Sequence, residues 1–368
     1  MKKILFVSNT ANFSKFNKPY MKWCSENGWQ VDYCAPDDEV VLDCDNHIVL
    51  PIPRSPFSKE SLKCIKELRK ILQTEQYNII HCHTPMGAVI ARLAAKKLFK
   101  QKKVKVIYTA HGFHFYKGAS MLNWLLYYPV EKYLSKYTSV LITINKEDYQ
   151  FAKKKFNTKE ISYSDGVGID LNKFYSVDTN KKIDLRKNKG FSENDFIILY
   201  VAEFIPRKNH KLIFDIVPNL KQRIPNLKII LAGKGELLDY YKKYCEENNY
   251  QDIVVFTGYT TEINTYCNIS DVLLMPSFQE GLPISMIEAI STGLPVIASN
   301  IRGHTDVIVP EKNGFLCNLK DSMSFYNAVI KLYQNLDLRH AIGDNNKKRA
   351  KLYSINNVLN KVIEHYRL

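Results

Sequence analysis

Hydrophobic positions along the chain fall into short runs rich in β-branched residues, separated by longer amphipathic stretches. Five runs in the first half predict strands, at residues 4–7, 31–34, 79–82, 106–109 and 140–143. Helical spacing of apolar residues lies between them, at residues 61–76, 87–99 and 121–137. Such alternation is typical of a parallel sheet covered by helices. The first half therefore predicts a doubly wound α/β domain.

The alternation lapses in a polar, lysine-rich segment at residues 178–194 and then resumes. Further strands are predicted at residues 197–201, 229–232, 253–257, 272–275 and 296–298, and helices at 209–223, 236–248 and 283–292. The predicted fold class is α/β, with two doubly wound Rossmann-like domains facing a central cleft. Their expected bounds are 1–177 for the N-terminal, acceptor-side domain, 178–194 for a linker and 195–350 for the C-terminal, donor domain. Such folds bind ligands beyond the carboxyl ends of their strands.

The end of the chain, residues 351–368, carries one more amphipathic helix. This helix could pack on its own domain or cross back to the first. We expect it to pack near the N-terminal domain.

Composition narrows the class of protein. A chain of 368 residues with 45% hydrophobic residues can bury two cores. Its eight cysteines include no C-x-x-C pair, which disfavours zinc binding and favours free thiols in a reducing compartment. The apolar run after Met1 stops at Ser8, as in a first strand rather than a signal peptide, and no run approaches about 18 apolar residues. We expect a cytoplasmic protein with no membrane span.

The net charge is +15 and is unevenly spread. Residues 1–180 hold 27 Lys and Arg against 17 Asp and Glu, whereas the remainder hold 25 against 20. A basic half could attract nucleic acid, anionic lipid or a phosphate-bearing substrate. A generally lysine-rich surface would give the same count. The charge alone leaves these alternatives open, and of the three partners we do not expect nucleic acid.

The most informative segment is residues 275–299, MPSFQEGLPISMIEAISTGLPVIAS. A strand ends near its start, a loop carries Glu280 and Gly281, Pro283 suits a first helical turn and Gly293 a helix end. Backbone amides at a helix start form a natural seat for a phosphate. Glu280 and Glu288 would lie about 10 Å apart, which suits gripping an extended ligand better than sharing a metal. Each carboxylate alone could also be an ordinary surface group.

A second segment, VAEFIPRKNH at residues 201–210, follows the first strand of the second domain. Arg207 and Lys208 at a strand end can neutralise a diphosphate, although a solvated basic turn is the plain alternative. Glycine-containing turns follow the next two strands, at Gly233 and at Gly258 with Tyr259. These glycines could simply permit tight turns.

Histidines follow two strands of the first half. His111 precedes Gly112 in YTAHGFH, where the missing side chain allows close approach to a ligand, and His114 is a weaker candidate. His81 and His83 point to one face of a strand, but no third ligand for a metal is apparent from the spacing. His83 is expected to line a cleft, although a buried histidine at a strand end is the plain alternative.

Together these motifs resemble retaining glycosyltransferases of family 4, which have the GT-B fold. The resemblance covers nearly the whole chain and is most specific in the second half, where Glu280 and Glu288 form the E-x7-E signature. It implies that Glu280 meets hydroxyls of the transferred sugar, that Glu288 binds the ribose, and that Gly281, Leu282 and Pro283 lie near the sugar and diphosphate.

The remaining motifs gain roles by the same resemblance. Arg207 and Lys208 match the motif for the donor phosphates, with Glu203 standing where many members have arginine. His111 matches the histidine of T-x-H-G, near the reacting carbon. Gly233, Gly258 and Tyr259 would border the donor base. Asp170 lies in an interdomain motif and is taken as structural. Residues 8–14, SNTANFS, replace the glycine-rich loop of many members.

The implied activity is transfer of a hexose or N-acetylhexosamine from a nucleotide sugar, with uridine as the expected base, onto a lipid-linked or oligosaccharide acceptor. His83 and His114 would lie on the acceptor side. The run from 109 to 148 looks most like bacterial capsule and exopolysaccharide enzymes, which implies a peripheral position at the inner face of the cytoplasmic membrane. The aromatic segment 113–128 could lie on that membrane or form a buried helix.

No cofactor is expected beyond the donor substrate, and no metal, because no D-x-D sequence lies at a suitable strand end. Two other functions stay open from sequence. A nucleotide-sugar 2-epimerase would use the same fold. A catalytically inactive protein that binds nucleotide or glycan would keep the fold without the reaction, although the intact charged residues argue against it.

Overall fold

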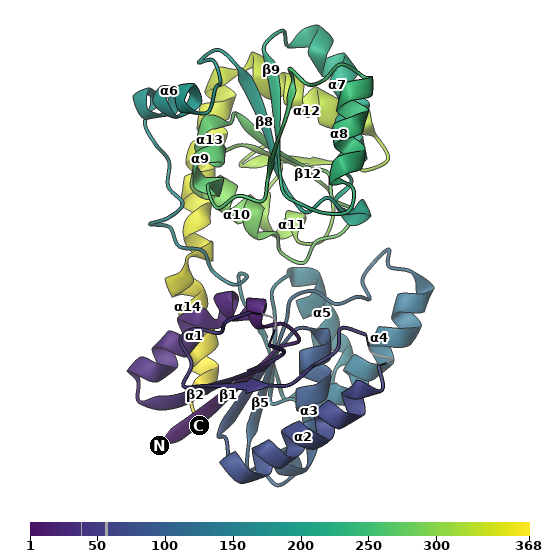
Figure 1. Cartoon of the computed structure of the whole chain (residues 1–368), viewed down its shortest axis with the longest axis vertical. Helices are drawn as coiled ribbons and strands as arrows, with labels where there is room; N and C mark the ends of the chain where they lie inside the picture. The colour runs from purple at the N-terminus through teal and green to yellow at the C-terminus, as the bar shows by residue number, and fades with distance from the viewer. Residues whose placement is uncertain (38, 56–57) are drawn as a thin grey trace. The chain divides into compact units, whose positions relative to one another are not determined.

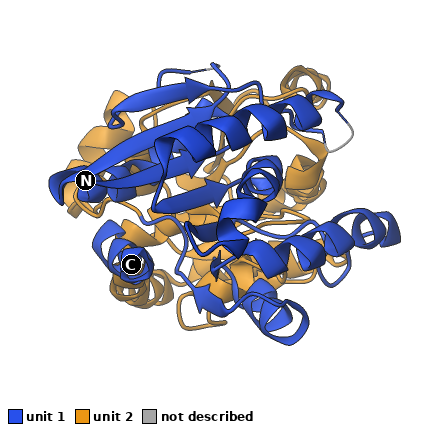
Figure 2. Cartoon of the chain, turned by 90° about the horizontal axis from the view of Figure 1, so that it is seen from below, with its two compact units in different colours: residues 1–168, 355–368 blue, residues 169–354 orange. Residues whose placement is uncertain are grey.

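The computed structural model describes residues 1–37, 39–55 and 58–368, which divide into two compact units. Unit 1 comprises Met1–Gly168 and Ile355–Leu368, and unit 2 comprises Ile169–Ser354. Figures 1 and 2 show that each unit is a sheet with helices on both of its faces.

The sheet of unit 1 is parallel and has the strand order β3-β2-β1-β4-β5-β6-β7. Its strands are β1 Lys2–Val7, β2 Trp29–Ala35, β3 Asn46–Val49, β4 Ile79–His83, β5 Lys105–Ala110, β6 Val140–Thr143 and β7 Glu160–Tyr163. The order reverses between β1 and β4. Ligands of doubly wound sheets bind beyond the carboxyl ends of the strands at such a switch point.

Two apolar layers cover the sheet of unit 1. The helices are α1 Ser14–Glu26, α2 Glu60–Glu75, α3 Pro85–Lys100, α4 Met121–Leu134, α5 Lys146–Lys155 and α14 Ile355–Ile363, with short 3₁₀ turns η1 Ala11–Phe13, η2 Ser135–Tyr137 and η5 Glu364–Tyr366. One layer gathers buried residues of α2 and α3, and the other gathers those of α1 and α14. Val358, Val362 and Tyr366 are buried there, so the C-terminal helix belongs to unit 1 (Figure 1).

The sheet of unit 2 is also parallel, with the order β10-β9-β8-β11-β12-β13 and a switch point between β8 and β11. Its strands are β8 Phe196–Val201, β9 Leu227–Ala232, β10 Val254–Gly258, β11 Val272–Met275, β12 Val296–Ser299 and β13 Gly314–Cys317. Its helices are α6 Thr179–Asn188, α7 His210–Arg223, α8 Leu238–Glu247, α9 Ile263–Ile269, α10 Ile284–Ser291, α11 His304–Val307, α12 Ser322–Gln334 and α13 Leu336–Ala350, with 3₁₀ turns η3 Pro206–Lys208 and η4 Lys351–Tyr353.

The ten predicted strands coincide with strands of the structure, but β3, β7 and β13 were not predicted. All three are four-residue strands at a sheet edge. An edge strand is partly exposed and needs no continuous apolar run, so its sequence carries little periodic signal. The sequence also assigned no helix to α12 or α13. In α13 the buried residues are Ile342, Gly343, Asn346 and Ala350, which form no broad apolar stripe.

The linker expected at 178–194 differs from the structure, because α6 occupies most of it. The side chain of Asp178 caps the helix by accepting from the Lys181 amide at 2.9 Å. Arg186 is buried, bonds the Ile269 carbonyl at 2.8 Å and pairs with Asp271 at 2.7 Å. A buried ion pair thus fixes α6 in unit 2 where an apolar face would otherwise do so. The units divide instead at Gly168, beside Asp170, whose side chain accepts from the Asn172 amide at 2.9 Å.

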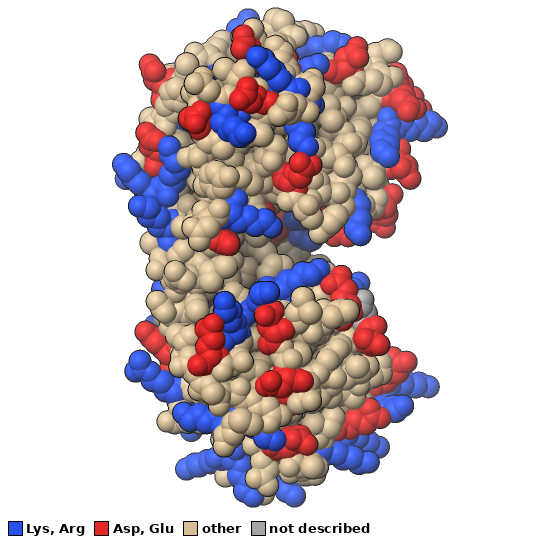
Figure 3. All heavy atoms as spheres, turned by 60° about the vertical axis from the view of Figure 1, so that its left-hand side comes forward, with Lys and Arg blue, Asp and Glu red and all other residues tan. Residues whose placement is uncertain are grey.

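The surface carries both signs of charge. On the face drawn in Figure 3, lysine and arginine side chains alternate with acidic ones over both units. The excess of positive charge is therefore dispersed on this face. Within the described part of the chain, no helix combines the length and hydropathy needed to cross a membrane, and all eight cysteines are free thiols.

Candidate active site

The loops that follow β8 and β11 meet at the switch point of unit 2. The hydroxyl of Tyr200 donates to the Lys208 carbonyl at 2.7 Å and lies 3.0 Å from the Ser277 hydroxyl. The Phe278 amide donates to the Arg207 carbonyl at 2.9 Å. These bonds tie the two loops together, so the basic turn and the Glu280 loop, distant in sequence, become neighbours.

The Glu280 carboxylate forms ion pairs with both Arg207 and Lys208. Lys208 Nζ lies 2.5 Å from Oε1, and an Arg207 guanidinium nitrogen lies 3.5 Å from Oε2 and donates to the Gln279 carbonyl at 2.8 Å. The Glu280 side chain is only 7% exposed, that of Lys208 14% and that of Arg207 41%. Burial raises the pKa of Glu280, but the charge and hydrogen bond of Lys208 outweigh it, so the pKa is lowered. Two cations facing one carboxylate leave positive charge for an anionic ligand.

The segment after Glu280 leads into α10. Leu282 and Pro283 are buried and Gly281 is half-buried. Pro283 is the N-cap residue, one position before the first helical turn in which it was expected, and it offers no side-chain cap. Among the described residues, no hydrogen-bond acceptor contacts the amides of Gly281 and Leu282. These donors are therefore available to a ligand at the helix start.

Glu288 lies in the second turn of α10, where it is half-buried. Burial raises the pKa of its carboxyl to about 7, and the charge of Lys173 offsets this only in part. A carboxyl that changes its protonation state near neutral pH, one turn after the start of α10, is a candidate functional residue.

The predicted glycine turns lie at the ends of β9 and β10. The Gly233 amide donates to the Gly258 carbonyl at 2.9 Å. A Cβ at Gly233 would lie 1.9 Å from the Ala202 carbonyl oxygen, so this glycine allows the turn to approach the loop after β8. Gly258 has a φ of +67°, and the ring of Tyr259 is exposed and lies 5.5 Å from Lys234 Nζ. Gly233, Gly258 and Tyr259 therefore lie at the carboxyl ends of the strands, at the same edge of the sheet as Lys208.

In unit 1, His83 and His111 meet at the ends of β4 and β5. His83 Nδ1 lies 3.2 Å from His111 Nε2, and the His83 Nε2 atom is buried with no hydrogen-bond partner among the residues that the structure describes. Burial lowers the pKa of His111 to about 4 and the pKa of His83 well below 6.5. Both rings are therefore neutral near pH 7, and they act as hydrogen-bonding groups and not as cations.

His81 lies beside His83, with ring centroids 4.2 Å apart, but both of its ring nitrogens are bonded within the protein, and His114 lies elsewhere. His81 is fully buried, with its ring nitrogens 2.6 Å from the Tyr366 hydroxyl and 2.8 Å from Thr109 Oγ1, so it anchors the C-terminal turn to β4. The ring of His114 stacks on Tyr127 of α4 at 4.6 Å. The structure thus brings His83 and His111 together and places His114 on a different wall of unit 1.

Comparison with known proteins decides the family. Two family profiles match, one described as glycosyl transferases group 1 over residues 181–349 and one described as glycosyl transferase 4-like over residues 3–145. A Bacillus subtilis (strain 168) protein named as a glycosyltransferase, EpsD, is 39% identical over 358 residues, covering 96% of this chain and 93% of that protein. The chain belongs to glycosyltransferase family 4.

One further relative of this family 4 enzyme and one solved structure of similar fold are informative. The UDP-Gal:alpha-D-GlcNAc-diphosphoundecaprenol alpha-1,3-galactosyltransferase of Escherichia coli is 30% identical over 313 residues, 84% of this chain and 78% of that one. The structure of Anabaena Alr3699/HepE in complex with UDP and glucose superposes with a TM-score of 0.80 at 17% identity, covering 100% of this chain and 99% of that chain. The predicted GT-B fold is confirmed, and the activity class is that of a glycosyltransferase.

One group at the site of this family 4 enzyme was not predicted. His304 follows β12, is fully buried and bonds the Ser299 carbonyl through Nδ1 at 2.9 Å, while within the described part of the chain its Nε2 has no hydrogen-bond partner. Burial lowers its pKa to about 4, although the charge of nearby Glu280 acts in the opposite direction. A Cβ at Gly303 would lie 2.5 Å from the Gly281 carbonyl oxygen, so this glycine lets the β12 loop pack on the Glu280 loop. The sequence signal that could have identified His304 is its position in the loop after the strand β12.

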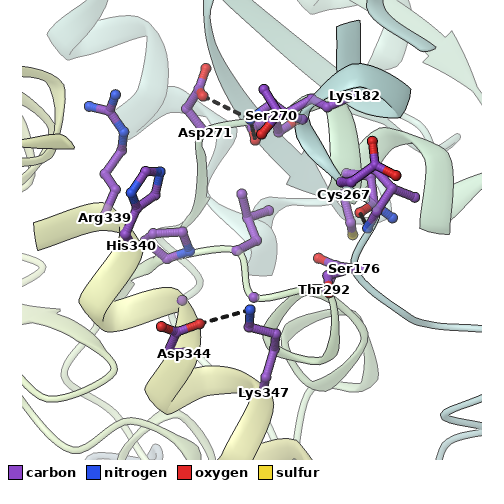
Figure 4. Close-up of a pocket in the computed structure, with 18 of the residues that line it drawn as sticks. Ser176, Lys182, Cys267, Ser270, Asp271, Thr292, Arg339, His340, Asp344 and Lys347 are labelled. Carbon is purple, nitrogen blue, oxygen red and sulfur yellow. Dashed lines mark hydrogen bonds and ion pairs between the residues drawn. The ribbon is translucent and has the colours of Figure 1, made fainter. Parts of the chain in front are cut away.

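A separate cavity of about 430 Å³ lies in unit 2 near the amino ends of β11 and β12 (Figure 4). Its charged groups largely satisfy one another: Lys182 pairs with Asp271 at 3.0 Å and Lys347 with Asp344 at 2.8 Å. Doubly wound sheets bind substrates at the opposite, carboxyl edge, where Arg207, Lys208 and Glu280 lie. Among the described residues, no group of three or more His, Cys, Asp or Glu side chains is arranged to hold a metal ion.

Proposed function

We propose that this enzyme transfers a hexose or N-acetylhexosamine from a UDP-sugar to a lipid-linked saccharide, with retention at the anomeric carbon, in the synthesis of a capsule or exopolysaccharide. The observation that carries the proposal is the Arg207–Lys208–Glu280 cluster at the switch point of unit 2. The names of the relatives support the finer details. The Escherichia coli enzyme uses UDP-Gal and a diphosphoundecaprenol acceptor, and the Anabaena structure holds UDP.

The donor diphosphate would replace Glu280 as the ion-pair partner of Lys208 and Arg207. Lys208 and Arg207 would neutralise its oxygens, with the amides of Gly281 and Leu282 adding hydrogen bonds. Glu280, released from Lys208, would accept hydrogen bonds from hydroxyls of the sugar, and Glu288 would accept them from the ribose. Gly233, Gly258 and Tyr259 would border the base.

Catalysis would then be mainly electrostatic. As the bond from the anomeric carbon to the phosphate oxygen breaks, negative charge grows on the leaving diphosphate, where fixed positive charge and amides stabilise it most. The acceptor hydroxyl attacks the same face of the sugar, and its proton passes to the leaving phosphate oxygen. Neutral His111 and His83 would contribute hydrogen bonds and not charge, with His111 beside the reacting carbon. No step requires a metal. We also propose a peripheral position at the inner face of the cytoplasmic membrane, where a lipid-linked acceptor is available.

A panel of nucleotide sugars tests the donor. A ligand that binds only the folded protein raises its unfolding temperature, so a UDP-sugar should raise it more than the matching GDP- and ADP-sugars. The preferred donor is then used with a saccharide diphosphate acceptor, and formation of the elongated product is measured. Isomerisation of the donor without an elongated product would instead indicate a 2-epimerase, and binding without either reaction would indicate an inactive binding protein.

Arg207→Ala tests the phosphate site. We expect a fall in kcat of about 10²- to 10³-fold, the loss typical of one transition-state donor, with little change in unfolding temperature because Arg207 is partly exposed. Lys211→Ala is the matched control: it removes a cation from the first turn of α7, where Lys211 pairs with Asp215 on its own helix. Wild-type turnover of the Arg207 variant would contradict the proposed phosphate site.

A further inference from the structure

Unit 1 contains a cavity of about 720 Å³ between α2, α3, α4 and the loop after β5. Small-molecule sites commonly range from about 300 to 1,000 Å³. The walls are mainly apolar, with side chains from all three helices: Leu62 and Ile65, Met86, Val89 and Leu93, and Leu126, Tyr127 and Val130. Figure 1 shows α2, α3 and α4 on one side of the sheet of unit 1.

The buried charges at the floor of this cavity are paired with each other, and Arg54, which also lines the cavity, is exposed. Glu131 lines the cavity and pairs with the buried Arg92 at 2.9 Å. Arg92 also bonds the Ala88 carbonyl at 3.0 Å and lies over the Tyr108 ring at 4.3 Å. The two charges are satisfied within the protein, so the space above them suits a neutral apolar group rather than an ion.

The cavity opens onto an apolar surface. Leu62 and Val130 line it and are 68% and 42% exposed. On the same helix as Val130, the side chains of Met121, Leu122 and Leu125 are also largely exposed. Trp124 and Tyr128 of the same helix are partly buried and pack against the core. Exposed apolar side chains that line a cavity, as Leu62 and Val130 do, are typical of a surface that meets lipid or a partner.

The loop that follows β5 also lines the cavity. Gly112, Phe113 and His114 line it, and they directly follow His111 in the chain. A molecule with a saccharide at His111 could therefore extend an apolar chain into the space between the helices.

We propose that this cavity binds the first isoprene units of the lipid-linked acceptor, with the exposed residues of α4 at the side where the chain leaves the protein. The inference rests on the proposed function, which supplies the isoprenoid as the committed occupant. The apolar walls, the pairing of Arg92 with Glu131 and the lining by the loop that follows His111 support the assignment to this cavity.

Two substitutions fill the cavity while leaving its floor intact. Val89 and Leu93 are half-buried on α3 and face the space, so Val89→Trp and Leu93→Trp place a larger side chain in it. Lys97→Trp is the matched control, because it adds the same side chain to an exposed position of α3. Unfolding temperatures of all three variants are measured first.

Direct binding is measured with farnesyl phosphate, using butyl phosphate and a straight-chain alkyl phosphate of similar carbon number for comparison. We expect farnesyl phosphate to raise the unfolding temperature of the wild type and of Lys97→Trp, but not that of the two cavity variants. Equal stabilisation of all four proteins would overturn the site. Equal stabilisation of the wild type by the straight chain would overturn the isoprenoid assignment.

Transfer is measured with two acceptors that carry the same saccharide diphosphate on a farnesyl or an ethyl group. The cavity variants should lose roughly 10- to 100-fold in kcat/KM with the farnesyl acceptor, corresponding to one buried apolar side chain, and keep wild-type values with the ethyl acceptor. Equal losses with both acceptors would overturn the inference. If the wild type transfers to neither acceptor, the proposed function fails while the binding experiment still decides the cavity.

Discussion

Replacing Lys208 with methionine should leave the Glu280 carboxylate buried without its nearest cation. In the wild type the two side chains are 14% and 7% exposed and their charged atoms are 2.5 Å apart. Methionine keeps the apolar stem and removes the ammonium group. Arg207 remains 3.5 Å from the other carboxylate oxygen, but it is 41% exposed, and water screens its charge.

The magnitude follows from the burial of the pair. Removing one partner of a buried ion pair costs about 3–5 kcal/mol, because the other charge is left uncompensated. Since Arg207 remains, we expect the lower end, about 3 kcal/mol. For a unit of this size that corresponds to a fall in unfolding temperature of roughly 6–12 °C. Transfer activity should be lost as well, because the donor phosphates lose a cation.

The assay is a double-mutant cycle with Glu280→Gln, followed by thermal unfolding. The amide of glutamine is neutral, so the double variant no longer buries an unpaired charge and should unfold closer to the wild-type temperature than Lys208→Met alone. Its activity should stay low. In the double variant, therefore, we expect the unfolding temperature to recover while the transfer activity does not.

The pH dependence gives a second test. In the wild type the pKa of Glu280 is lowered, so the stability that it contributes is present near neutral pH and is lost as the pH falls through its ordinary range. Without Lys208, burial outweighs the remaining charges and raises the pKa of Glu280. Acidification then protonates the Glu280 carboxyl and removes the cost of burying its charge. The difference in stability between the wild type and Lys208→Met should therefore become smaller as the pH is lowered from about 8 to about 5. An unchanged unfolding temperature at pH 8, or a deficit that widens on acidification, would refute this reasoning.

Three further predictions concern other parts of the chain. Glu131→Ala leaves Arg92 buried without its partner, so we expect unit 1 to lose about 3–5 kcal/mol of stability, measured by urea unfolding. Gly233→Ala forces a Cβ against the Ala202 carbonyl and should cost about 1–3 kcal/mol, seen as a lower unfolding temperature; an unchanged value would show that the turn can move away. Because burial raises the pKa of Glu288 to about 7 and ribose hydroxyls favour its ionised form, affinity for a nucleotide sugar, measured by calorimetry, should increase between about pH 6 and pH 8 in the wild type and stay flat in Glu288→Gln.

Much of the architecture was readable from the sequence because central parallel strands are buried on both faces. Runs such as Phe196–Val201 must then be continuously apolar, and that signal survives without any knowledge of neighbours. The edge strand Glu160–Tyr163 lacks the signal because one side of it faces no partner. Helix α6 was taken for a linker because Arg186 and Asp271 fix it, and a pairing between distant residues leaves no periodic pattern.

At the candidate site, the sequence by itself determined the residue types and their place at strand ends, which suffices to name Arg207, Lys208 and Glu280. Only the tertiary structure decided that Glu280 holds both cations in the free protein and that His304 lies nearby. The apolar cavity beside α4 was likewise beyond the sequence. Local patterns record what each segment buries, whereas charge pairing and the space left between helices depend on which segments meet, and only packing of the whole unit sets that.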